Sequence, residues 1–197
     1  MALASVRPAT PDDVEEIVRI QSITWRAAYA ELVPEAALER LSGPAALQAW
    51  TAAVSAGDGH HVLVATEGEW TVGFCAAAPA GAEDPDAPAN HAQIVVLLVE
   101  PRWGRRGHGR RLLAAAFEAL NRDGAELGLA WLPERDVASR ACFDRIGWDA
   151  DGLVRILDAG DRELREVRLA GPLRVGNRDR RPRVQDADGF RDSPRGI

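Results

Sequence analysis

The chain has 197 residues and a net charge of −6, and its length fits one domain with a substantial hydrophobic core. No stretch approaches the roughly 20 apolar residues of a membrane span, and the N-terminus lacks the apolar segment of a secretory signal, which predicts a cytoplasmic protein without a membrane partner. Cys75 and Cys142 lie in apolar surroundings and predict buried thiols, and no cysteine or histidine spacing is typical of a metal site.

The first third of the chain predicts one strand followed by helices. Residues 3–7 form a short strand, and Thr10 and Pro11 then supply the cap and the first position of a helix. Apolar residues continue at helical spacing through Trp25. Two further helical stretches are expected over residues 35–41 and 45–54.

The next segment predicts a hairpin and a loop. Residues 61–67 and 70–77 are strands joined by a tight connection at Gly68. Residues 79–90 are rich in proline, alanine and acidic residues, which predicts a mobile loop.

Residues 94–113 carry the most informative pattern in the chain. A continuous apolar run over 94–99 ends at a proline and predicts a buried strand. A loop rich in glycine and arginine follows, and then a helix with an apolar stripe formed by Leu112, Leu113, Ala116, Phe117 and Leu120. A strand, a glycine loop and a helix N-terminus aim backbone N–H groups and the positive end of the helix dipole at one anion. This segment therefore predicts a phosphate-binding loop.

The remaining elements complete a mixed sheet. Gly124 is expected to end the helix, and a strand over 125–132 follows. A helix over about 137–146 and a hairpin of strands over 154–157 and 163–169 come next. This order predicts an α/β sheet that is antiparallel in its first part and has a parallel crossover in its second.

The last 24 residues differ from the rest in charge. Residues 174–197 hold seven arginines and four aspartates, a net charge of +3, so the other residues of this −6 chain carry −9. Low apolar content predicts a disordered tail after a domain over residues 1–173. An arginine-rich tail can bind nucleic acid, but we favour a solvated extension.

Three segments resemble, in order and spacing, the GNAT superfamily of acetyl-CoA-dependent N-acetyltransferases, over about residues 3–173. Residues 25–34 (WRAAYAELVP) are similar to the substrate-side helix region of many bacterial members. The loop after residues 94–99 is similar to the family's phosphate loop, Q/R-x-x-G-x-G/A. Residues 131–136 (WLPERD) and 140–148 (RACFDRIGW) are similar to the family's fifth strand and the helix beyond it.

Two other phosphate motifs fit less well. A dinucleotide fingerprint requires a third glycine where this chain has Leu112. A P-loop requires a lysine, and the chain contains none.

The resemblance implies an α+β fold with a mostly antiparallel sheet of six to seven strands, helices on both faces, and a wedge where the fourth and fifth strands splay apart. Acetyl-CoA, the acetyl donor, would lie in this wedge, and no metal is implied. Backbone groups would pair with its pantetheine amides at Leu97, Leu98 and Val99. Its phosphates would be held by Arg105, Arg106, Gly107, His108, Gly109 and Arg110. Its other side would be lined by Asp136, Ser139 and Phe143.

The resemblance also implies an acceptor. Trp25 and Tyr29 would line the acceptor side, where a primary amine of a small molecule or peptide attacks the thioester directly. A second copy of the chain, as a homodimer partner, is compatible with this reading.

Two departures from the family pattern concern cofactor binding. Gly104 stands where the phosphate loop has glutamine or arginine, and Arg105 stands where glycine is common. Asp136 replaces a frequent asparagine and is expected to cap the following helix, since a carboxylate would repel phosphate.

Two further departures concern proton transfer. Phe143 has no hydroxyl where many members have a tyrosine that protonates the thiolate, and we favour core packing for its ring. Gln93 stands where some members have a glutamate base; it could hold a water, and His91 on the same strand face could accept the proton. His108 is interpreted as a loop residue. The alternative function is therefore an acyl-CoA-binding sensor or interaction module.

Overall fold

The computed structural model describes residues 3–81, 84, 87, 90–160 and 162–174. The predicted elements form with similar bounds, except that the strand predicted over 154–157 begins five residues earlier. In chain order the elements are β1 (Ala4–Pro8), η1 (Pro11–Asp13), α1 (Val14–Tyr29), α2 (Glu35–Arg40), α3 (Pro44–Val54), β2 (His61–Glu67), β3 (Trp70–Pro79), β4 (His91–Val99), η2 (Pro101–Trp103), α4 (His108–Arg122), β5 (Leu127–Pro133), α5 (Val137–Arg145), β6 (Asp149–Asp158) and β7 (Glu163–Pro172).

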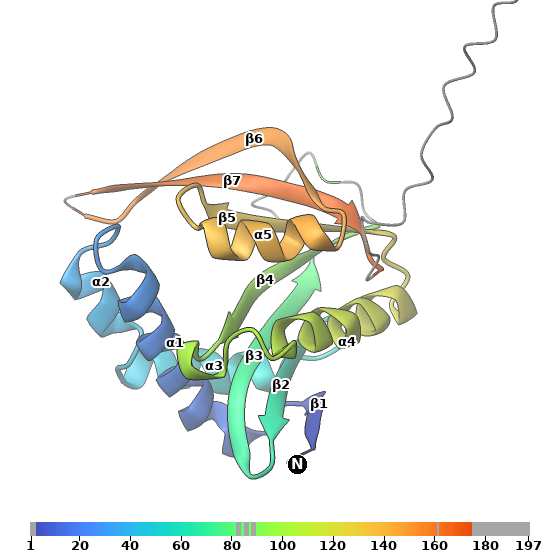
Figure 1. Ribbon diagram of the computed structural model, residues 1–197, viewed down its shortest axis with the longest axis horizontal. Helices are drawn as coiled ribbons and strands as arrows, with labels where there is room; N and C mark the ends of the chain where they lie inside the picture. The colour runs from blue at the N-terminus through green and yellow to red at the C-terminus, as the bar shows by residue number, and fades with distance from the viewer. Residues whose placement is uncertain (1–2, 82–83, 85–86, 88–89, 161, 175–197) are drawn as a thin grey trace, which may run out of the picture.

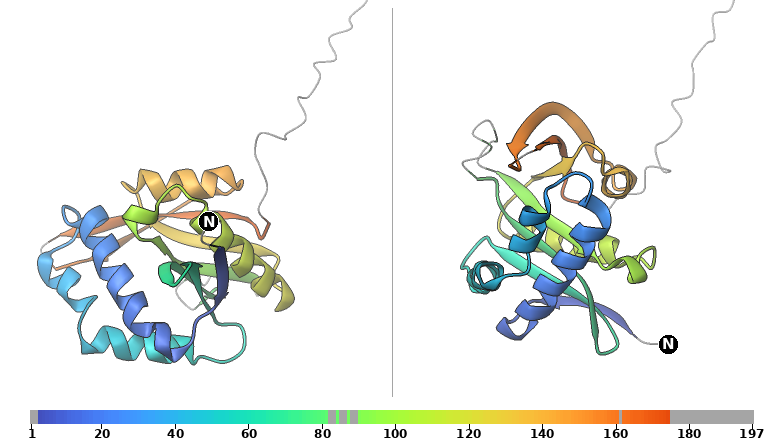
Figure 2. Two further views of the ribbon diagram at one scale, coloured as in Figure 1. Left: turned by 60° about the horizontal axis from the view of Figure 1, so that its bottom comes forward. Right: turned by 90° about the vertical axis from the view of Figure 1, so that its left-hand side faces the viewer.

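The seven strands form one sheet in the order β1-β2-β3-β4-β5-β7-β6 (Figure 1). All neighbouring strands are antiparallel except β4 and β5, which are parallel. Helices α1 and α3 cover one face, and α4 and α5 cover the other (Figure 2). This arrangement confirms the predicted mixed sheet with helices on both faces.

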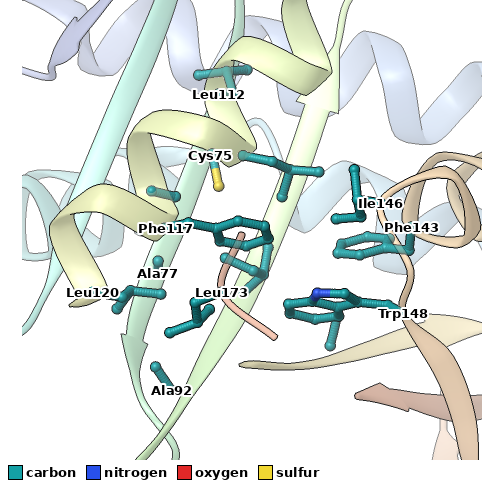
Figure 3. Close-up of a cluster of buried hydrophobic side chains, with 14 of the residues drawn as sticks. Cys75, Ala77, Ala92, Leu112, Phe117, Leu120, Phe143, Ile146, Trp148 and Leu173 are labelled. Carbon is teal, nitrogen blue, oxygen red and sulfur yellow. The ribbon is translucent and has the colours of Figure 1, made fainter. Parts of the chain in front are cut away.

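The larger core lies between the sheet and the two helices α4 and α5 (Figure 3). The apolar stripe predicted for α4 is buried along its whole length, from Leu112 to Leu120. Cys75 is a buried free thiol within this core, and burial raises its pKa to about 12. Cys142 on α5 is a partly buried free thiol. A second core joins α1 and α3 to the opposite face of the sheet through Phe74.

Two predicted segments fall mainly outside the described residues. Only Arg174 of the tail over 174–197 is described, and of the loop over 79–90 only residues 79–81, 84, 87 and 90 are. Asp84 is buried and accepts hydrogen bonds from Arg168 Nη1 at 3.0 Å and from Trp131 Nε1 at 3.0 Å. Among the described residues, no helix is long and apolar enough to cross a membrane.

Trp148 packs directly against two glycines in neighbouring strands. Its indole is buried, stacks on Phe117 at 5.6 Å between ring centroids, and donates a hydrogen bond from Nε1 to the Pro172 carbonyl at 3.0 Å. A Cβ at Gly128 in β5 would lie 2.4 Å from the indole, and one at Gly171 in β7 would lie 2.3 Å from it. Only glycine therefore lets Trp148 lie flat on these two strands.

We expect Gly128→Ala and Gly171→Ala each to lower the free energy of unfolding by about 1–3 kcal/mol, because the new methyl group overpacks the core. Urea unfolding measures the change. Gly57→Ala is the matched control, because a Cβ there meets no heavy atom within 4 Å. Equal stability of the three variants would contradict this packing.

Candidate active site

The fourth and fifth strands part after a short parallel contact. β4 and β5 pair only at His91↔Leu127, Ala92↔Gly128 and Gln93↔Leu129. Beyond this point β4 continues to Val99 beside β3, and β5 continues to Pro133 beside β7. The edge of β4 from Leu97 to Val99 thus faces a gap rather than a neighbouring strand, which confirms the predicted wedge.

A bulge in β4 lies at the point of parting. Ala76 pairs with Val96 while Ala77 pairs with Ile94, so Val95 is an extra residue in β4. Its side chain is 53% exposed and lines an apolar hollow of about 310 Å³ between α3 and the sheet. Because a bulge bends its strand, it favours the divergence of β4 from β5. No sequence feature predicted this bulge.

The loop from β4 to α4 contains two residues in the left-handed conformation. Arg105 has φ 60° and Gly107 has φ 84°, and α4 begins at the next residue, His108. An L-residue other than glycine rarely adopts a positive φ, so the φ of Arg105 explains why glycine is common at this position. The turns place the loop's backbone at the N-terminus of α4, where N–H groups lack helical partners.

The arginines of this loop have different partners. Arg106 forms an ion pair with Glu67 at 3.1 Å and lies 4.8 Å above the Trp103 ring. Arg111 donates to the Arg106 carbonyl at 3.1 Å. Arg105 and Arg110 are exposed and have no acidic partner among the described residues. These two guanidinium groups are therefore the ones available to an external anion.

His108 is not the loop residue that the sequence predicted. It is the first residue of α4, and its side chain is 1% exposed. Its Nε2 lies 2.9 Å from a Glu67 carboxylate oxygen, while its Nδ1 has no hydrogen-bond partner among the described residues. Because Glu67 ends β2, this contact and the Arg106 ion pair attach the loop between β4 and α4 to the sheet. Any backbone contribution of His108 to phosphate binding remains a prediction.

Tyr29 and Asp136, predicted for the acceptor and the cofactor side, are in direct contact. The Tyr29 hydroxyl at the end of α1 donates a hydrogen bond to Asp136 Oδ2. Asp136 Oδ1 accepts the Ser139 backbone N–H at 2.9 Å, which confirms Asp136 as the cap of α5. Burial, followed by the hydrogen bond to Asp136, raises the pKa of Tyr29 well above its usual value. The contact thus joins α1 to α5.

Other groups beside Tyr29 add to its environment. The Trp25 ring meets the Tyr29 ring edge-on at 4.8 Å, and its buried indole N–H has no partner among the described residues. Glu166 on β7 is buried, accepts a hydrogen bond from Arg155 Nε at 2.7 Å, and further raises the pKa of Tyr29 by its charge. No local pattern in the sequence marks Glu166, because its burial depends on how β7 pairs with β5.

A hollow of about 430 Å³ adjoins this contact. It lies where the chain leaves α1, where β5 ends and where β7 begins. Glu31 and Arg135, two of its lining residues, are close in sequence to Tyr29 and Asp136 respectively. Its charged residues include three glutamates and three arginines: Glu31, Glu134, Glu163, Arg135, Arg162 and Arg165.

Phe143, His91 and Gln93, which the sequence suggested for core packing or proton transfer, lie apart from the contact between Tyr29 and Asp136. Phe143 is 1% exposed and packs against Trp148 at 5.0 Å between ring centroids, as expected for core packing. His91 and Gln93 lie where β4 and β5 still pair, and His91 Nδ1 is 3.1 Å from the Asn90 side-chain oxygen. From Leu127, opposite His91, to the end of β5 is about 20 Å of strand. Their roles in binding and catalysis remain predictions.

Comparison with known proteins gives one family. A family model described as "Acetyltransferase (GNAT) family" matches residues 17–148. No curated protein matches the chain.

Solved structures share the fold at low sequence identity. A ribosomal-protein-alanine N-acetyltransferase from Brucella melitensis has a TM-score of 0.69 at 21% identity, covering 85% of this chain and 99% of its own. The PaiA N-acetyltransferase from Thermoplasma acidophilum, in complex with coenzyme A, has a TM-score of 0.68 at 14% identity, covering 86% and 99%. YncA, a putative acetyltransferase from Salmonella typhimurium with its cofactor acetyl-CoA, has a TM-score of 0.60 at 20% identity, covering 87% and 94%.

The environment of Tyr29 predicts a distinctive titration, which is simple to follow because Tyr29 is the only tyrosine. In the native protein we expect no tyrosinate absorbance at about pH 10–11, whereas the chain unfolded in urea titrates near pH 10. Because the folded-state pKa is the higher one, the stability that Tyr29 contributes is complete below about pH 10 and is lost as the pH rises further.

Absorbance titrations of native and unfolded protein measure this difference, and Asp136→Asn should reduce it. A native Tyr29 that ionises at the same pH as the unfolded chain would contradict the contact with Asp136.

Proposed function

Because the chain belongs to the GNAT acetyltransferase family, we propose that it transfers the acetyl group of acetyl-CoA to a primary amine of a small molecule or a peptide. The observation that carries this proposal is the contact between Tyr29 and Asp136 beside the wedge. This contact joins the end of α1, which the family resemblance assigns to the amine acceptor, to the cap of α5, which it assigns to acetyl-CoA. A family member that only bound a nucleotide would not need an acceptor surface beside the gap.

The residues around the gap fit acetyl-CoA, which supplies an acetyl group activated as a thioester. The unpaired edge of β4 at Leu97, Leu98 and Val99 can pair with the two pantetheine amides as a strand does. The loop over 104–109 offers backbone N–H groups, and Arg105 and Arg110 offer free charges to the phosphates. Gly109 lies in the first turn of α4, and a Cβ there would make ordinary van der Waals contact with Val99 at 3.9 Å and Cys142 at 4.0 Å.

In the proposed reaction the amine nitrogen attacks the thioester carbonyl carbon, the carbon–sulfur bond breaks, and the sulfur leaves as a thiolate. A cationic amine first loses one proton to become the nucleophile, its nitrogen loses a second proton as the amide forms, and the thiolate takes one up, so one proton is released overall. Tyr29 stays protonated because of its raised pKa, and it holds Asp136 in place. The carboxylates of Asp136 and Glu166 favour a cationic amine beside Tyr29. His91, or a water held by Gln93, remains our candidate for accepting the proton, but because up to about 20 Å of strand separates these residues from the end of β5, a proton from an amine beside Tyr29 would reach them only through water.

The hollow of 430 Å³ is the proposed approach for the amine. Its lining includes Glu31, two residues after Tyr29, and Arg135, the residue before Asp136, and its charged residues are glutamates and arginines. An acceptor that carries both an ammonium and a carboxylate, such as an amino acid or the terminus of a peptide, would find a partner for each charge. The charged lining therefore favours a small-molecule or peptide amine that carries both charges over an amine with an apolar body.

We expect the chain to release free CoA thiol from acetyl-CoA only when a primary amine is added, which a thiol-reactive dye measures over a panel of amines. Asp136→Asn should lower kcat/KM for a cationic amine by about 10- to 100-fold, since a hydrogen bond to a charged group contributes about 1.5–3 kcal/mol. CoA binding without turnover for every amine would refute the transfer reaction and favour the acyl-CoA sensor.

We also expect Arg105→Ala and Arg110→Ala to weaken CoA binding by about two- to tenfold each at low salt, because each removes an exposed charge beside the phosphates. The effect should decrease as salt screens the charges. Arg122→Ala, at the other end of α4, is the control and should leave the affinity unchanged. Calorimetry with CoA measures the dissociation constants, and equal affinities for all three variants would contradict the assigned phosphate site.

A further inference from the structure

The last strand of the sheet, β6, presents a long apolar edge. Among the described residues β6 pairs with β7 alone, and it forms the upper boundary of the molecule in Figure 1. Four of its apolar side chains are exposed: Leu153 (41%), Val154 (40%), Ile156 (57%) and Leu157 (38%). Unpaired backbone groups and exposed apolar side chains on one strand are a template for pairing with another strand.

The opposite edge of the sheet lacks these properties. β1 has only five residues and ends at Pro8, which has no N–H to donate. Short length and proline are common means of preventing edge pairing. β6 has ten residues and no proline, its register against β7 shifts between Ala150 and Val154, and its regular stretch runs from Val154 to Asp158. The two edges therefore differ in the way expected if β6 has a partner and β1 has none.

The sequence of β6 is self-complementary about Arg155. We propose that β6 of one copy pairs antiparallel with β6 of a second copy about a two-fold axis at Arg155, which joins the two sheets into one. In this register Val154 faces Ile156 of the second copy, and Leu157 lies toward Leu153, the last residue of the irregular stretch that precedes Val154. A closed two-fold dimer uses the same surface on both copies, and cross-strand apolar pairs of this kind stabilise antiparallel strands.

The charges of β6 agree with this register. Arg155 pairs with Glu166 of its own chain at 2.7 Å and lies 4.6 Å above the Trp131 ring, so each guanidinium at the axis has its counter-ion. Moving the axis by one residue would place Arg155 opposite a leucine.

Sedimentation velocity of the full chain over roughly 1–100 µM tests the proposal in the range where small interfaces associate. We expect a species of twice 21.3 kDa that becomes dominant as concentration rises. Ile156→Lys should remain monomeric, because a lysine on the edge prevents pairing. A wild-type chain that stays monomeric over this range would overturn the proposal, because β6 would then not pair with a second copy.

A matched control separates edge pairing from general surface effects. Ile23→Lys changes a residue of similar exposure (40%) on α1 and should dimerise like the wild type. Circular dichroism and thermal unfolding of both variants show whether each is folded. Loss of the dimer in both folded variants would overturn the assignment to β6.

Cysteine pairs test the register directly. Single variants Val154→Cys and Ile156→Cys should form an intermolecular disulfide when mixed and oxidised, because the two positions face each other across the axis. Each variant alone should cross-link far less, since its two cysteines are then two residues out of register. Cross-linking of either variant alone at the rate of the mixture would overturn the two-fold axis at Arg155.

Discussion

The parting of β4 from β5 is the constraint on which the site depends. Their parallel pairing stops after Gln93 and Leu129, with a bulge at Val95 on one side and a continuous β5–β7 pairing on the other. A strand edge left open inside a sheet has unpaired backbone groups, and these require a partner. The loop proposed to bind phosphate follows the end of β4, and the contact between Tyr29 and Asp136 lies beyond the end of β5.

Charge is distributed unevenly around this gap. Five arginines occupy residues 102–111, but Arg102 pairs with Glu100 at 2.5 Å and Arg106 pairs with Glu67. Among the described residues Arg105 and Arg110 are exposed without an acidic partner, and Arg111, also exposed, donates to the Arg106 carbonyl. The buried carboxylate of Glu166 and the cap Asp136 instead lie near Tyr29. An anionic donor and a cationic acceptor would thus meet the gap from differently charged sides.

Much of the fold could be predicted because it depends on local patterns. The apolar stripe of α4, the cap Asp136 and the hairpin strands are encoded by spacing and by single residues. The bulge at Val95, the burial of His108 against Glu67 and the partner of Tyr29 were missed or unassigned. Each of these depends on residues at least 17 positions apart in the chain, and on how strands and helices are placed, which no local pattern specifies.

A crystal structure of the chain with CoA tests the central claim most directly. We expect the pantetheine arm to lie between β4 and β5, with its amides paired to the backbone of residues 97–99, and the pyrophosphate to lie against residues 104–109. CoA bound elsewhere on the molecule, with the gap between β4 and β5 left empty, would contradict the account.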